Sequence, residues 1–139
     1  MPEKNFISYL KSLKPKDWNK KVTDKWTVKE LVAHMIGWER GDPEIIKSTW
    51  KTKQTPWFTK TKDYDDFNQK NIDYYKNYKP AELIRELEQW QRKVKEEIER
   101  IGEDKLKARL DLFGWLFDTG ENSHYNLHYR QIENAVNKN

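Results

Sequence analysis

The chain has 139 residues, 35% of them apolar, and a formal net charge of +4, which fits one domain spanning residues 1–139. The absence of cysteine excludes disulfides and thiolate metal ligands, and no apolar run approaches the roughly 20 residues of a membrane helix, so we expect a cytoplasmic protein with no membrane partner. Basic and acidic residues are interleaved, as in residues 93–100, so nucleic acid is not expected as a partner.

Apolar residues recur at helical spacing, whereas no stretch shows the alternation of a β-strand, so we predict an all-α fold. A short first helix is expected over residues 3–13 and must end before Pro15, because proline disfavours a helical conformation at the preceding residue. Residues 14–25 are predicted to form a connector, with Trp18 and Val22 turned inward.

The second helix has the clearest predicted start. Thr27 and Glu30 form a T-x-x-E capping box, in which each side chain satisfies a free backbone N–H group. The Gly-Asp-Pro sequence at residues 41–43 is expected to interrupt or kink this helix, with Asp42 capping a continuation as far as Trp50.

The second half of the chain contains a loop and further helices. Residues 51–62 are predicted to be a loop carrying Pro56, Trp57 and Phe58. The remaining helical stretches are expected at residues 63–78, 81–101, 110–117 and 121–137. Proline before the 81–101 helix and glycine after it mark its ends. We therefore predict a four-helix bundle with an aromatic loop between the second and third helical stretches.

The three histidines form the pattern that most strongly indicates chemistry. His124 and His128 are four residues apart, so they share one face of the last predicted helix, and His34 lies on the second helix. If these helices face each other, three imidazoles can hold one metal ion and leave a coordination position open, as catalytic sites do. Each histidine also has a structural interpretation: His34 as a core imidazole bonded to a carbonyl, and the other two as half-exposed residues near acidic groups.

Aromatic and acidic residues near the histidines are further candidates. The candidate pocket walls are the aromatic residues Trp38, Trp57, Tyr125 and Tyr129, although aromatics at helical spacing often belong to a core. The candidate acid–base or supporting groups are the carboxylates Glu39, Asp118 and Glu121, with ordinary surface charge as the alternative. No HExxH motif identifies a general base, so no catalytic residue is assigned.

Two segments carry a family resemblance. Residues 26–38, WTVKELVAHMIGW, resemble the W-[ST]-V-K-[DE]-[VL]-[LV]-x-H-[LM]-x-x-W segment of DinB-like proteins, nearest to the ClbS/DfsB branch. Residues 124–132, HYNLHYRQI, are similar to the H-x-x-x-H-x-x-Q-I pattern of the last helix in that superfamily. The resemblance covers nearly the whole chain and is strongest over residues 26–136.

This resemblance implies a DinB/YfiT-like four-helix bundle, often a homodimer, with a divalent metal held by His34, His124 and His128. It also implies a choice of activities on small molecules, namely hydrolysis, isomerisation, or transfer using a low-molecular-weight thiol. The ClbS/DfsB branch is associated with protection against a reactive genotoxin, and its members need not keep the metal triad.

A three-imidazole site suits zinc or nickel and would activate bound water or a thiol as a nucleophile. We therefore expect a metal-dependent hydrolase or low-molecular-weight thiol transferase. One alternative is a metal-free ClbS/DfsB-like stress or detoxification protein that binds a small molecule in the bundle cavity. Another is an interaction module that packs its Trp57-Phe58 loop on a partner.

Overall fold

The computed structural model describes residues 4–118 and 123–138. Over these ranges the chain is helical, with one isolated β-bridge between Lys21 and Thr27, which confirms the all-α prediction. The elements are α1 (Lys4–Ser12), η1 (Pro15–Asn19), α2 (Val28–Thr52), η2 (Trp57–Thr59), α3 (Asp65–Tyr75), α4 (Pro80–Ile101), α5 (Glu103–Lys107), α6 (Leu110–Phe117) and α7 (His124–Asn137), where η denotes a 3-10 helix.

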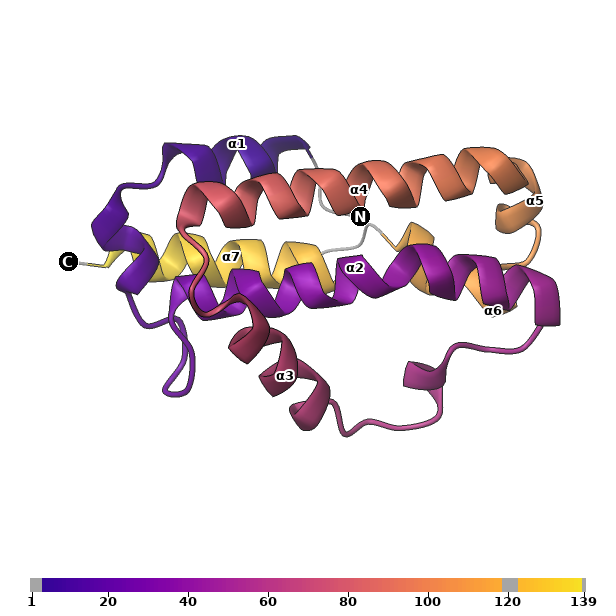
Figure 1. Cartoon of the computed structure of the whole chain (residues 1–139), viewed down its shortest axis with the longest axis horizontal. Helices are drawn as coiled ribbons and strands as arrows, with labels where there is room; N and C mark the ends of the chain where they lie inside the picture. The colour runs from indigo at the N-terminus through magenta and orange to yellow at the C-terminus, as the bar shows by residue number, and fades with distance from the viewer. Residues whose placement is uncertain (1–3, 119–122, 139) are drawn as a thin grey trace.

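The helices α1, α2, α4 and α7 extend along the long axis of the molecule and pack on one another (Figure 1). α2 and α4 run in one direction, and α1 and α7 run in the opposite direction. α3 slants across α2, while α5 and α6 lie at the end of the molecule where α2 and α4 finish. None of the described helices combines the length and apolar composition needed to cross a membrane.

The start of α2 follows the prediction, but its middle does not. The Thr27 side chain accepts a hydrogen bond from the backbone of Glu30, and the Glu30 carboxylate accepts one from the backbone of Thr27, which confirms the capping box. The predicted interruption at residues 41–43 is wrong, because α2 continues through Pro43 to Thr52. Proline removes only one i→i−4 backbone bond, so packing on both sides of it is enough to keep the helix continuous.

Two apolar clusters make up the core. The larger one joins α1, α2, α4 and α7 through residues such as Phe6, Val32 and Leu87. The smaller one joins the far ends of α2 and α4 to α5 and α6 through residues such as Ile46 and Phe113. α4 contributes to both clusters, with Leu87 in the larger one and Val94 in the smaller one.

α3 approaches α2 closely at one glycine. A Cβ atom added to Gly37 would overlap side-chain atoms of Asn71. The Asn71 amide donates to the Phe67 carbonyl at 3.0 Å and accepts from the Arg40 guanidinium at 3.0 Å. Glycine at position 37 therefore sets the spacing between the two helices.

Candidate metal centre

His34 projects from the buried face of α2 and is only 2% exposed. Its Nδ1 atom lies 2.6 Å from the carbonyl oxygen of Leu31, so this nitrogen carries the proton and donates it, which leaves the lone pair on Nε2. Burial, reinforced by the neighbouring His128, lowers the pKa of His34 to about 3. The ring is therefore neutral at pH 7, the state in which imidazole binds metals. The carbonyl-bonded histidine considered as a structural alternative is thus also oriented as a ligand.

His124 and His128 lie one turn apart at the start of α7, where the Ser123 side chain caps the helix by accepting from the backbone of Asn126. The Nδ1 atom of His128 lies 2.7 Å from Oε1 of Gln131 and donates to it, which again leaves Nε2 with the lone pair. Burial lowers the pKa of both histidines, and at His124 the two other imidazoles add to the effect.

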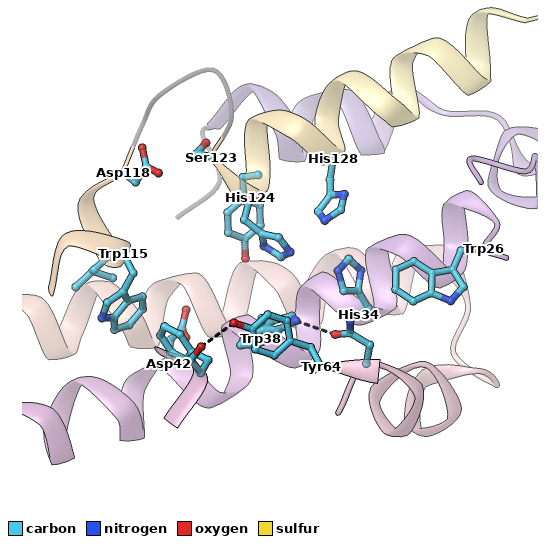
Figure 2. Close-up of a pocket in the computed structure, with 14 residues that line it drawn as sticks. Trp26, His34, Trp38, Asp42, Tyr64, Trp115, Asp118, Ser123, His124 and His128 are labelled. Atoms are coloured by element: carbon cyan, nitrogen blue, oxygen red, sulfur yellow. Dashed lines mark hydrogen bonds between the residues drawn. The ribbon is translucent and has the colours of Figure 1, made fainter. Parts of the chain in front are cut away.

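The three rings converge (Figure 2). The ring centroids lie 5.3 Å apart for His34 and His124, 4.8 Å for His34 and His128, and 4.5 Å for His124 and His128. One ligand nitrogen from each residue lies within 4.8 Å of the other two. Nitrogens around a tetrahedral zinc ion at 2.0–2.1 Å are about 3.3 Å apart, so small side-chain rotations would close the cage. All three imidazoles are neutral, and in His34 and His128 the Nδ1 proton is donated to an oxygen acceptor. This arrangement fits a divalent metal ion.

A cavity of about 450 Å³ opens beside the histidines. The described residues that line it are Trp26, His34, Trp38, Asp42, Phe58, Tyr64, Asn68, Trp115, Leu116, Asp118, Ser123, His124, Tyr125 and His128. Of the four aromatic residues predicted as walls, Trp38 and Tyr125 line this cavity. Trp57 stacks on Trp38 at 5.5 Å without reaching the lining, and Tyr129 packs against Phe6 and Tyr9 on α1. Tyr129 thus belongs to the core between α1 and α7.

Asp42 is a lining residue that sequence reasoning treated only as a helix cap. It lies on α2 at the same spacing of four that relates His34 to Trp38, so all three side chains share one face of the helix. Burial, and then the charge of Glu39, raise the pKa of the Asp42 carboxyl well above its ordinary value. The spacing of four was the signal that would have placed Asp42 in the site.

Glu39 is buried, and the Tyr125 hydroxyl donates to its Oε2 atom. No described residue bonds to the other carboxylate oxygen. Burial raises the pKa of Glu39. Of the other predicted carboxylates, Asp118 lines the cavity and is exposed, whereas Glu121 lies outside the described residues. Glu39 supports the cavity from behind Tyr125, a role that connects α2 to α7.

Comparison with known proteins agrees with the two motifs. A family model described as the DinB superfamily matches residues 3–132. No curated protein and no solved structure matches the chain at a significant level. Because the family model covers most of the 139 residues, the chain belongs to the DinB superfamily.

Proposed function

We propose that this member of the DinB superfamily is a metal-dependent hydrolase of small molecules, with His34, His124 and His128 as ligands of a zinc or nickel ion. The observation that carries the proposal is the convergence of three neutral imidazoles in the wall of a cavity. In this proposal α1, α2, α4 and α7 form the four-helix bundle, and the ligands come from two facing helices, as in other metal-binding bundles.

A divalent ion held by these three histidines would act as a Lewis acid and lower the pKa of a water molecule bound to it. The chain's own residues prepare the site. The Leu31 carbonyl and the Gln131 amide oxygen each accept an Nδ1 proton and thereby fix the ring orientations of His34 and His128. Trp38 and Tyr125 line the adjacent cavity and give it apolar surface beside the histidines.

The charges of the cavity favour water over a thiol as the nucleophile. Within the described lining there is no lysine or arginine, while Asp42 and Asp118 are both present. Low-molecular-weight thiols that carry carboxylates are held best by cationic side chains, which the described lining does not offer. We therefore rank hydrolysis above thiol transfer.

The second candidate function is metal-free binding, as proposed for a ClbS/DfsB-like detoxification protein. The aromatic lining favours it, because Trp26, Trp38 and Trp115 offer apolar surface that can hold a ligand without a metal. In that case the three histidines would be structural residues, with His34 buried, His128 half-buried and His124 exposed.

Reconstitution of activity tests the proposal. Protein without a histidine tag is stripped with a chelator, reloaded with zinc or nickel, and assayed against a panel of small aryl esters, amides and lactones. We expect metal-dependent hydrolysis that is lost in His34→Gln and His128→Gln. Ligand binding without hydrolysis of any member of the panel, with either metal, would favour the metal-free candidate.

A further inference from the structure

The part of α2 that lines the cavity carries different kinds of side chain at its two ends. His34, Trp38 and Asp42 follow one another at intervals of four residues and all line it. Eight residues of α-helix span roughly 12 Å, so the histidine cluster and Asp42 mark two separate places in the cavity. Figure 2 shows Asp42, Asp118 and Trp115 on one side of the three histidines and Trp26 on the other.

Aromatic rings surround the end of the cavity that holds Asp42. Trp38 meets Phe58 at 5.7 Å and Tyr64 at 5.2 Å, both edge to face. Phe58 in turn meets Trp115 of α6 at 5.3 Å. The hydroxyl of Tyr64 donates to the Phe58 carbonyl at 2.6 Å, and the indole N–H of Trp38 donates to Asn68 at 2.8 Å, so these rings are held in place. The faces of such rings attract positive charge.

The charges at this end are acidic. Asp42 and Asp118 line the cavity, and buried Glu39 lies one turn before Asp42 on α2. Within the part of the chain that the structure describes, no residue donates a hydrogen bond to the Asp42 carboxyl or forms an ion pair with it. An organic cation beside this half-buried carboxyl would favour its ionised form and offset part of the cost of removing the charge from water.

We propose that the cavity binds a small organic cation, an amine or quaternary ammonium compound, with its charged nitrogen beside Asp42 against the rings of Trp38 and Trp115. The identification of this cation as the substrate rests on the proposed hydrolase function, in which the reactive group at the other end of the molecule reaches the histidine cluster. Its binding does not depend on that function.

Other ligand classes fit the cavity less well. An anion would meet Asp42 and Asp118 without a lysine or arginine in the described lining to offset them. A neutral apolar molecule would cover the rings but form no ionic contact with Asp42. Burial and the charge of Glu39 raise the pKa of Asp42, and a positive charge bound beside it would favour the ionised carboxyl.

The test uses metal-free, full-length protein and two probes of the same shape, benzyltrimethylammonium and its neutral carbon isostere neopentylbenzene. Binding is followed by quenching of tryptophan fluorescence and by calorimetry. We expect the cation to bind at least about tenfold more tightly than the isostere. Asp42→Asn should remove most of that preference, and Trp115→Leu should lower the affinity for the cation by about threefold or more. Asp24→Asn, an exposed aspartate outside the lining, is the matched control and should change nothing.

Equal or tighter binding of the neutral isostere, or an Asp42→Asn variant that behaves like Asp24→Asn, would overturn the proposal. Circular dichroism confirms that each variant is folded, and the comparison of the two probes on the unmodified protein needs no variant. The outcome is separable from the hydrolase proposal: cation binding without metal-dependent hydrolysis would leave the cation site standing and remove only its role as a substrate site.

Discussion

The Nδ1 atom of His128 lies 2.7 Å from the Oε1 atom of Gln131, one turn further along α7. This contact places the ring proton on Nδ1 and presents Nε2 to His34 and His124. Gln131 is thus a positioning residue for the proposed metal centre, although it contacts no metal itself. It also gives a physical reason for the H-x-x-x-H-x-x-Q spacing of the last helix.

Gln131→Ala should weaken zinc binding by about 10- to 100-fold, because the His128 ring loses the acceptor that fixes its orientation. Competition with a chromogenic chelator at pH 7 measures the effect. Gln131→Glu retains an acceptor and should bind zinc at least as well as the parent. Asn134→Ala, an exposed change on the same helix, is the control. Equal affinity in Gln131→Ala and Asn134→Ala would show that the contact does not position a ligand.

Asp42 should make stability depend on pH. Its pKa is raised in the folded chain, so between the ordinary value of 3.8 and the raised value the native state binds more protons than the unfolded state. The free energy of unfolding should therefore fall as pH rises through this interval. Asp42→Asn removes this titrating group, so the free energy of unfolding of the variant should match that of the parent near pH 3.5. At pH 7 it should exceed the parent's by on the order of 1 kcal/mol. Urea unfolding at the two pH values checks this, and a constant difference between the proteins would contradict it.

The hydrogen bond from Tyr125 to Glu39 should contribute more to the free energy of unfolding than an exposed hydrogen bond does. Removing the hydroxyl in Tyr125→Phe leaves the buried carboxyl without this donor and should cost about 1–3 kcal/mol in the free energy of unfolding. In a Glu39→Met background the same substitution should cost much less, because the buried acceptor is gone. Urea denaturation of the four proteins in this double-mutant cycle gives the coupling, and additive effects would count against it.

Gly37 and Gly114 provide a matched pair of helical glycines. Alanine at position 37 would collide with Asn71 and push α3 away from α2, at a cost of about 1–3 kcal/mol. Alanine at position 114 meets no atom within 4 Å, so the higher helix propensity of alanine should stabilise α6 by up to about 1 kcal/mol. Thermal unfolding of both variants compares them. The opposite ranking would show that α3 is not held at this distance.

Local patterns predicted much of this architecture. Short-range sequence patterns predicted three features that the structure confirms: the capping box at Thr27, the proline that begins α4 and Gly102 at its end. These signals depend on contacts within one or two turns, where sequence spacing fixes the geometry. Pro43 shows the limit of the approach, because tertiary packing keeps α2 continuous across it.

The site was only partly predictable. Helical spacing alone brings His124 and His128 together. The approach of His34 depends on which faces of two distant helices meet, so the residues suggested it and the resemblance to a known family strengthened it. Contacts between distant segments carried no signal, as in the pairing of Glu39 with Tyr125 across 86 residues. Trp57 and Tyr129 illustrate the same limit, since large aromatics near a site pack behind it as readily as they line it.

The central claim is that His34, His124 and His128 bind one ion together. Its most direct test is the metal stoichiometry of tag-free protein, measured by native mass spectrometry at pH 7 with one equivalent of zinc. The account predicts one ion per chain in the parent and loss of most of it in each of His34→Gln, His124→Gln and His128→Gln. A parent that binds no ion, or single variants that hold as much as the parent, would contradict it.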